Sequence, residues 1–197
     1  NKKKNQALYG IIQGGKFKDL RKESTKFISS LPFQGFGMGS LFGEPKKETF
    51  AIAKTMMDLL PENKPKHFLG IGSIDDLFNY VEMGGDTFDC VLPTRLGRVG
   101  YVFLTPKGGG NINNKFRMRV TNAKFKDDKN PIDTNCGCYV CKNFSRAYLR
   151  HLCKAKELTF YTLASYHNLY FFYNLMSEMR KAIEKKKFKK LKREWLK

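Results

Sequence analysis

The sequence has no long apolar run. None of its hydrophobic stretches approaches the roughly 20 residues that a membrane-spanning helix needs, so we expect no membrane segment. It also shows no signal peptide, because it opens on Asn1 and a run of three lysines. We therefore expect a cytoplasmic protein. The absence of an initial Met further predicts that an N-terminal portion precedes this chain.

Acidic residues are scarce as well. The 197 residues include 18 Asp plus Glu against 37 Lys plus Arg, a formal net charge of +19 at pH 7. Such an excess favours a polyanionic partner, and nucleic acid is the commonest one. The simpler alternative is a lysine-rich surface that only keeps the protein soluble. Hydrophobic residues still make up 41%, enough for the core of one domain, or of one domain with an appendage.

The five cysteines are an odd number, and three of them lie close together: Cys136, Cys138 and Cys141. This clustering argues for a metal rather than a disulfide framework, and so for a reducing cytosol. Thiolates suit tetrahedral zinc, which needs a fourth ligand, and a site closed by four protein ligands is structural. From the residues alone, His151, Cys153 and His167 are all candidates for the fourth position.

Apolar strands alternate with amphipathic helices along the first half of the chain. The patterns predict strands at 7–12, 36–39, 67–71 and 87–92, and helices at 17–31, 45–60 and 74–83. This order favours an α/β fold with a parallel sheet covered on both faces. Reactive groups in such folds lie at the carboxyl ends of the strands. Gln13, Gly39, Gly70 and Asp89 occupy those ends, so we expect them to converge on one site.

Asp89 is the most informative of these residues. It lies in a run of apolar, strand-like residues, where a buried carboxylate is costly unless it is paired or used. Arg95 and Arg98 follow closely, and an acid beside a basic loop indicates chemistry on a polyanion. The alternative is an Asp that caps a turn before Pro93. The convergence of four strand ends favours the functional interpretation.

The pattern changes after Arg98. Segments 101–104 and 115–120 predict an antiparallel hairpin, 144–157 a helix, and the residues from Leu169 onward a final amphipathic helix. The tail from Lys181 to Lys197 has nine basic and two acidic residues, so it is either a solvated face or an arm that contacts phosphates. We therefore expect three parts, at 1–107, 108–168 and 169–197.

In combination, several motifs resemble the queuine tRNA-ribosyltransferases, also called tRNA-guanine transglycosylases. The motifs are Tyr9–Gly15, Leu69–Gly72, Phe88–Arg95, the three clustered cysteines, Ser145–Leu149 and His167–Asn168. The resemblance is closer to the bacterial type, because no RNA-binding domain follows the final helix. It implies a (β/α)8 TIM barrel with an inserted zinc-binding subdomain and a C-terminal helix. This chain would supply the last four strands, so we expect it to be poorly stable and inactive alone.

The resemblance also implies a reaction, in queuosine biosynthesis. Asp89 matches the nucleophile that attacks the ribose of guanosine at the tRNA wobble position and forms a covalent tRNA intermediate. A 7-deazaguanine, preQ1 by expectation, then replaces the guanine. His167 matches the fourth ligand of one structural zinc ion, and a homodimer is implied. The family's general acid/base and base-reading aspartates belong to the half of the barrel that this chain does not include.

Further residues take their expected roles from the same resemblance. The base-binding set is Gln13, Gly39, Ser40, Leu41, Leu69 and Gly70. The tRNA-binding set is Gly70, Ile71, Gly72, Ser73, Ile74, Asp75, Asp76, Thr94, Arg95, Leu96, Gly97 and Arg98. Gly39-Ser40-Leu41 stands where the family usually has Gly-Gly-Leu, which leaves the accepted deazaguanine open.

Two other hypotheses compete with the enzyme. One is a non-catalytic, zinc-stabilised tRNA-binding subunit of the same fold. The other is a zinc-stapled nucleic-acid-binding module from an unrelated family. The presence of Asp89, Gln13 and the arginine pair favours the enzyme, because a pure binding partner has no need of a nucleophile.

Overall fold

The computed structural model describes residues 5–39 and 45–197, which form two compact units. The sheet unit comprises the residues up to 72 together with 76–90. The helical unit comprises residues 73–75 and 91–197. Each unit has its own hydrophobic core.

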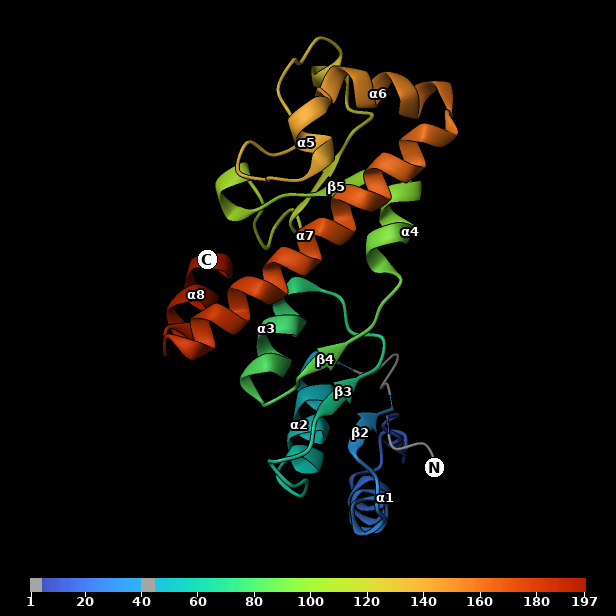
Figure 1. Cartoon of the computed structure of the whole chain (residues 1–197), viewed down its shortest axis with the longest axis vertical. Coiled ribbons are helices and arrows are strands. Elements are labelled where there is room, and N and C mark those ends of the chain that lie inside the picture. Colours follow the sequence, from blue (N-terminus) through green and yellow to red (C-terminus); the bar gives the residue numbers. More distant parts are fainter. Residues whose placement is uncertain (1–4, 40–44) are drawn as a thin grey trace. The chain divides into compact units, whose positions relative to one another are not determined.

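The sheet unit is built around a parallel four-stranded sheet in the order β1-β2-β3-β4 (Figure 1). Its strands are β1 (Tyr9–Ile12), β2 (Gly35–Met38), β3 (Lys66–Phe68) and β4 (Thr87–Phe88). The helices between them are α1 (Lys18–Ser30), α2 (Lys46–Met57) and α3 (Ile74–Glu82). Each strand pairs with the next one along the chain, which confirms the predicted parallel sheet.

One face of this sheet is covered by helices. Ile12, Phe36 and Phe68 point to that face and pack with Ile52 and Met56 of α2 into a buried core. Successive parallel crossovers are right-handed and therefore place their helices on the same side of a sheet. This packing explains the apolar residues on one face of each strand.

The opposite face of the sheet carries the alternate residues. Ile11 leans over Gly37, where an added Cβ would lie 2.6 Å from the Ile11 Cδ1 atom. The register then places His67 beside Gly37, and Thr87 beside His67. Ile11 is 44% exposed, so among the described residues this face is open. The prediction that both faces are covered holds for one face only.

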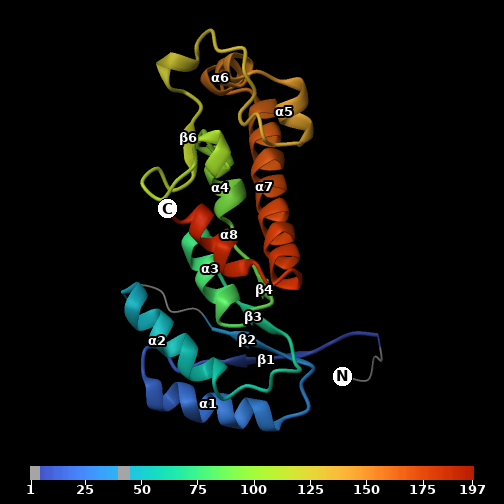
Figure 2. The same ribbon diagram turned by 90° about the vertical axis from the view of Figure 1, so that its left-hand side faces the viewer.

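The helical unit contains the rest of the chain. A two-stranded antiparallel sheet, β5 (Tyr101–Phe103) with β6 (Arg117–Arg119), confirms the predicted hairpin. The helices are α4 (Leu92–Arg98), α5 (Tyr139–Asn143), α6 (Arg146–Ala155), α7 (Leu158–Glu184) and α8 (Phe188–Trp195), and α7 is much the longest (Figure 2). Within the described ranges, no helix combines the length and apolar character needed to cross a membrane.

Three boundaries differ from the prediction. The fourth strand ends at Phe88 rather than at Leu92, because Leu92 and Pro93 begin α4, where the missing N–H of proline costs nothing. The helix expected at 144–157 is α6, which is slightly shorter, and the Ser145 hydroxyl caps its start by accepting a hydrogen bond from Tyr148 N at 3.2 Å. The single helix expected from Leu169 to the end of the chain is two helices: α7 begins earlier, at Leu158, and ends at Glu184, and α8 follows from Phe188.

Asn168 joins three elements of the helical unit. Its side chain is fully buried in α7, and its Oδ1 accepts a hydrogen bond from Phe103 N of β5 at 3.0 Å. Its Nδ2 donates to Pro93 O of α4 at 2.9 Å and to Tyr101 O at 3.1 Å. One amide thus satisfies three buried backbone groups, which would otherwise lie away from water without a partner.

Replacing Asn168 with Ala should destabilise the helical unit by about 3 kcal/mol, because it leaves buried backbone groups without hydrogen bonds. Trp195 is the one tryptophan of the chain and lies in the same unit, so its fluorescence during urea unfolding measures the change. The exposed Asn113→Ala is the matched control. Equal unfolding midpoints for the two variants would contradict the assigned role of Asn168.

Candidate functional site

The four strand ends of the sheet unit are linked to one another by hydrogen bonds just beyond the strands. Gly39 N donates to Ile12 O at 2.9 Å, which joins the ends of β1 and β2. Leu69 N donates to Met38 O at 3.4 Å, which joins β2 and β3. The structure therefore brings together the ends that the sequence predicted to converge. We call Gln13, Gly39, Leu69, Gly70 and Asp89 the strand-end site.

Gln13 lies directly over Gly39. A side chain at position 39 would collide with the Gln13 amide and would come within 2.8 Å of Ile12 O. Glycine is therefore required there, and it leaves the Gln13 amide room beside the backbone. An amide offers both a donor and an acceptor to a ligand. The backbone N–H of Gln13 is held separately, by the Ser24 hydroxyl at 3.1 Å.

A buried arginine supports this part of the site. Arg21 of α1 is fully buried, and its Nη1 donates to Ile12 O at 3.2 Å and to Gly39 O at 3.0 Å. Its Nε donates to Gly15 O at 2.8 Å. Burial lowers the pKa of Arg21, but an arginine stays protonated in a protein. The guanidinium thus fixes the chain on both sides of Gln13 relative to Gly39.

Asp89 immediately follows β4, and its carboxylate is 61% exposed rather than buried in a strand. Its Oδ1 accepts hydrogen bonds from His67 Nε2 at 3.1 Å and from Gly70 N at 3.3 Å. Gly70 has φ of +74°, a left-handed conformation that suits glycine and turns its N–H toward the carboxylate. Asp89 is therefore anchored at the end of the sheet, and the interpretation as a cap of the turn before Pro93 has no hydrogen bond to support it among the described residues.

Two of the base-binding candidates, Ser40 and Leu41, lie outside the described residues. The sequence analysis missed two residues that contact this site, His67 and Arg21. Neither stands in a recognisable local pattern, since their partners are distant in the sequence. The strand register would be needed to find His67, and an arginine in the helix that follows Gln13 is too common to single out.

The expected tRNA-binding residues fall in both units. Gly70, Ile71, Gly72 and Asp76 belong to the sheet unit, whereas Ser73, Ile74 and Asp75 belong to the helical unit. Asp76 forms an ion pair with Lys46 at 2.8 Å.

The second tRNA-binding segment lies on α4 in the helical unit. Arg95 and Arg98 are exposed on one face of this helix, where residues three apart are neighbours. Gly97 is buried against Ser165 of α7, and a Cβ there would lie 3.0 Å from Ser165 N. The Thr94 hydroxyl donates to Val91 O at 3.2 Å within the first turn, and Leu96 is half-buried. The arginine side chains are therefore presented on a helix that cannot easily shift.

The clustered cysteines meet a histidine inside the helical unit. The ligand atoms of Cys136, Cys138, Cys141 and His167 all lie within 4.8 Å of one another. The Nδ1 atom of His167 is 3.9 Å from the Cys136 sulfur and 3.4 Å from each of the other two. His167 lies in the middle of α7, not before it, and is fully buried. His151 and Cys153, the other two candidates, do not join this cluster.

The cluster fits a tetrahedral zinc ion. Zn–S bonds of about 2.3 Å and a Zn–N bond of about 2.0 Å place sulfur and nitrogen about 3.5 Å apart, close to the distances found. The other ring nitrogen of His167, Nε2, hydrogen-bonds Phe103 O at 2.8 Å, which leaves Nδ1 to face the sulfurs. The fourth ligand position that the residues alone left open is therefore filled by His167.

Close packing couples the protonation of the cluster's members. Hydrogen bonds with Cys136 and Cys141 lower the pKa of Cys138. Hydrogen bonds with Cys136 and Cys138 raise the pKa of Cys141. Burial lowers the pKa of His167, but hydrogen bonds with Cys136 and Cys138 outweigh burial and raise it to about 9. Three thiols this close cannot all ionise unless a positive ion neutralises them.

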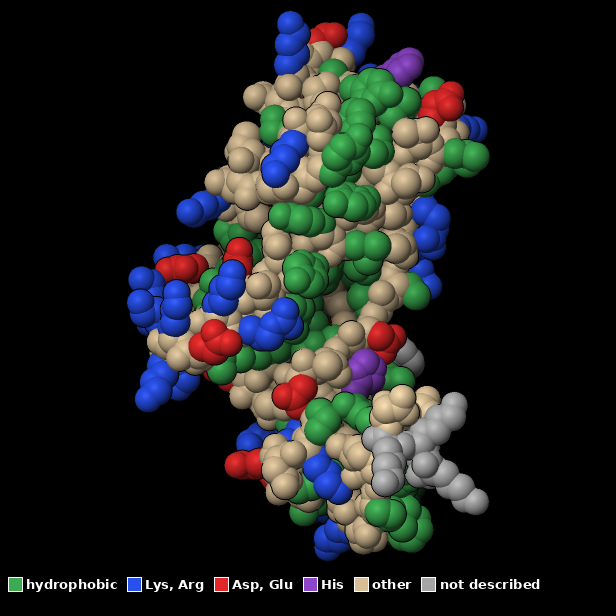
Figure 3. Space-filling model, in the orientation of Figure 1, with side chains coloured by type: hydrophobic (Ala, Val, Ile, Leu, Met, Phe, Trp, Pro, Cys, Tyr) green, Lys and Arg blue, Asp and Glu red, His purple; other side chains and the backbone are tan. Residues whose placement is uncertain are grey.

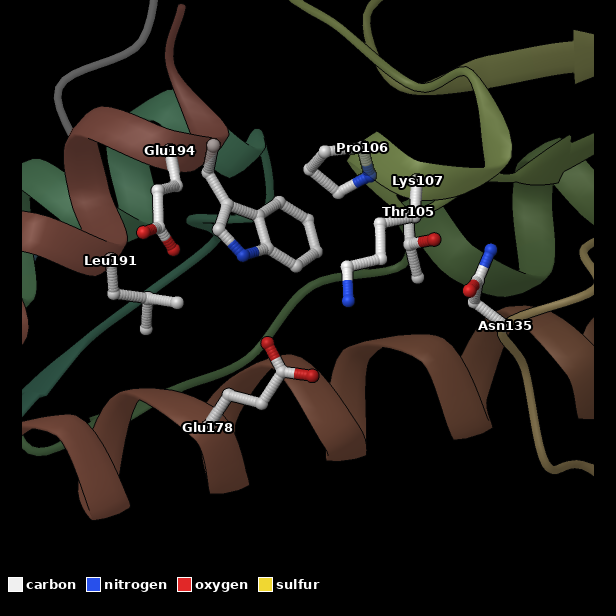
Figure 4. A pocket seen from close by; sticks show the side chains of 8 residues that line it. Thr105, Pro106, Lys107, Asn135, Glu178, Leu191 and Glu194 are labelled. Atoms are coloured by element: carbon white, nitrogen blue, oxygen red, sulfur yellow. The ribbon is translucent and has the colours of Figure 1, made fainter.

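A cavity of about 640 Å³ lies elsewhere in the helical unit, between the loop after β5, α7 and α8 (Figure 4). Glu178 projects into it from α7, and Glu194 and Lys107 also line it. Burial raises the pKa of Glu178. Two carboxylates and one ammonium group give this cavity the wrong balance of charge for RNA phosphates, so it is not part of the candidate site.

The basic tail, residues 181–197, consists of the last residues of α7, all of α8 and the residues that join and follow them. Lysine and arginine side chains gather there (Figure 3), and Lys185, Lys186, Lys187, Lys189, Lys190 and Arg193 are exposed. Trp195 is buried against Phe116 and Phe171, at ring-centroid distances of 5.6 and 5.9 Å. Part of the tail therefore packs, as its sequence indicated, while its charged side chains face solvent.

Comparison with known proteins identifies the family. The model of the queuine tRNA-ribosyltransferase family matches residues 1–197. A protein from Archaeoglobus fulgidus is 49% identical over 193 residues, which are 98% of this chain and 48% of that protein. The queuine tRNA-ribosyltransferase of Caldanaerobacter subterraneus is 46% identical over 193 residues, 98% of this chain and 49% of that enzyme. That of Bacillus cytotoxicus is 47% identical over 180 residues, 91% and 45% respectively.

The chain thus spans about half the length of the curated relatives that it matches. The matched range nevertheless includes the strand-end site, the arginine helix and the metal cluster. The chain belongs to the queuine tRNA-ribosyltransferase family.

Proposed function

We propose that this chain is the catalytic part of a tRNA-guanine transglycosylase, a pentosyltransferase that exchanges guanine at the wobble position of tRNA for a 7-deazaguanine, preQ1, in queuosine biosynthesis. One observation carries the proposal: a carboxylate, Asp89, is anchored through one oxygen at the same end of the parallel sheet at which a glutamine lies over a glycine. Family membership supplies the reaction class.

The fold supports a second element of the proposal. We take the four strands as one half of a (β/α)8 barrel, the last four strands, with the zinc-binding subdomain inserted after them. The uncovered sheet face, with Ile11 44% exposed, is the face that a closed barrel would fill with side chains. The full-length enzyme is therefore this chain together with the half of the family's length that it does not span.

In the proposed reaction, a carboxylate oxygen of Asp89 attacks the anomeric carbon of the wobble ribose. The C1′–O bond forms while the C1′–N9 bond breaks, and the guanine leaves with the bonding electron pair and takes a proton from an acid. The 7-deazaguanine then loses its proton to the same group and displaces Asp89 from the sugar. An ionised carboxylate suits an oxocarbenium-like transition state, as in glycoside hydrolysis. By resemblance, the acid/base belongs to the other half of the barrel.

The remaining residues hold the two substrates. Gln13 would read the lactam edge of the base, and Gly39, Ser40 and Leu41 with Leu69 and Gly70 would contact the base from the backbone and cover it. Gly70–Asp76 and Thr94–Arg98 would contact tRNA, with Arg95 and Arg98 on bases or phosphates. The target base must leave its stack to reach Asp89. We also propose that the enzyme acts as a homodimer.

Asp89→Asn in the full-length enzyme should abolish the covalent tRNA adduct, because a neutral amide cannot displace a base from ribose. The adduct is measured on a denaturing gel with labelled tRNA, and base exchange with labelled guanine. Asp86→Asn, a carboxylate three residues earlier that binds Lys66 N at 2.8 Å, is the control and should keep the adduct. Adduct formation by Asp89→Asn would remove Asp89 as the nucleophile. Binding of tRNA without any adduct in the unaltered enzyme would favour the non-catalytic subunit.

The metal cluster should bind one zinc ion per chain, measured by elemental analysis of the purified protein. Cys138→Ser should lose the zinc and lower the melting temperature of the helical unit, followed by Trp195 fluorescence, because the ion links the 136–141 loop to α7. Cys153→Ser and His151→Gln should keep the zinc, since neither residue joins the cluster. Zinc loss in either control would overturn the ligand assignment.

Arg95→Gln and Arg98→Gln should each weaken tRNA binding and lower the slope of log affinity against log salt by about one, if each arginine contacts one phosphate. The slope is obtained from filter binding at several salt concentrations. Lys26→Gln, an exposed cation on α1, serves as the control for a general loss of positive charge. Identical slopes for all three variants would exclude the arginine pair from the tRNA interface.

A further inference from the structure

His67 is held on both sides of its ring at the strand-end site. It lies on β3, on the open face of the sheet, and the register pairs it with Thr87 of β4. Its Nδ1 is 2.9 Å from the Thr87 hydroxyl, and its Nε2 is 3.1 Å from Asp89 Oδ1. The imidazole side chain is 26% exposed. Both polar atoms of the ring are therefore engaged, and the ring cannot rotate without breaking a hydrogen bond.

The partners decide which ring nitrogen carries the proton. An ionised carboxylate only accepts hydrogen bonds, so Nε2 must be the donor to Asp89. In the neutral imidazole Nδ1 is then an acceptor, and the Thr87 hydroxyl must donate to it. Thr87 thus fixes the tautomer, and the tautomer fixes the hydrogen bond to Asp89. The three residues form a chain that runs from β4 to β3 and back to the end of β4.

The two oxygens of Asp89 differ as a result. Oδ1 accepts from His67 and from Gly70 N, whereas Oδ2 has no hydrogen bond to any described residue. A carboxylate held in this way cannot turn about its Cβ–Cγ bond, and it presents a single oxygen with its lone pairs available. Holding a reacting atom in one geometry is a large part of catalysis, and small misplacements cost much of the rate.

We propose that His67 is the positioning residue of the nucleophile. It donates a hydrogen bond to Asp89 Oδ1, and Thr87 sets the His67 tautomer that makes this possible. Oδ2 is then the oxygen that bonds to the ribose. This inference rests on the proposed function. In the adduct, Oδ1 becomes the ester carbonyl oxygen and keeps both hydrogen bonds. When the incoming base displaces the ester, the returning negative charge is met by the same two donors.

The test measures single-turnover adduct formation and steady-state exchange in the full-length enzyme. His67→Phe keeps an aromatic ring but has no donor, and it should slow adduct formation by about 10- to 100-fold. KM for tRNA should stay nearly unchanged, because His67 is not among the residues proposed to contact tRNA. His67→Gln, whose amide can donate toward Asp89, should recover much of the rate. Thr87→Val, matched in shape but without the hydroxyl, should slow adduct formation by a smaller factor.

A spectroscopic readout separates positioning from a merely structural role. Side-chain ¹⁵N spectra of the full-length enzyme at mildly alkaline pH should show a His67 signal, which is assigned by its loss in His67→Phe. We expect His67 as the Nε2–H tautomer with a slowly exchanging proton, and we expect this signal to change in Asp89→Ala and Thr87→Val. His151→Gln, an exposed control, should leave it intact.

The possible failures are distinct. If the unaltered enzyme forms an adduct and His67→Phe forms it at the same rate, the positioning role is overturned while the proposed function stands. A rise in KM for tRNA with an unchanged rate of adduct formation also overturns it. If the unaltered enzyme forms no adduct at all, both the proposed function and this inference fail.

Discussion

The guanidinium of Arg21 is the interaction on which the strand-end site depends. It is a buried cation that donates to the backbone carbonyls of Ile12, Gly15 and Gly39, and Nη1 also lies 3.7 Å from the Met56 sulfur. Removing a cation from water is costly, and oriented carbonyl dipoles offset that cost. One of its nitrogens, Nη2, has no hydrogen-bond partner among the described residues. The arrangement therefore lowers the free energy of unfolding but holds the ends of β1 and β2 in one position.

The rest of the strand-end site follows from that anchor and from the sheet register. With Gly39 fixed, the Gln13 amide has room only over the glycine, and the hydrogen bonds from Gly39 to Ile12 and from Leu69 to Met38 extend the sheet by one step. The same extension brings Gly70 to Asp89. Residues that follow four strands thus lie along one edge of the sheet, which is the property that makes the ends of parallel strands suited to chemistry.

Much of this could be predicted from the sequence, because the relevant signals are local. Apolar runs bounded by glycine mark the four strands, and three closely spaced cysteines mark a metal ligand set. The end of β4 could not be predicted, because Val91 and Leu92 are apolar in a strand and in a helix alike, and only the packing of α4 decides between them. His67 was missed because its role is set by Thr87 and Asp89, which are some twenty residues away along the chain. The fourth zinc ligand was ambiguous for the same reason, until the fold placed His167 beside the loop.

The inequivalence of the two Asp89 oxygens has a stereochemical consequence. In the proposed reaction, such a carboxylate would approach the sugar from the side opposite the departing base. Each displacement at that carbon inverts its configuration, and the proposed reaction contains two. The nucleoside would therefore regain its original β-anomeric form, and the altered tRNA would keep the backbone shape that the decoding ribosome reads.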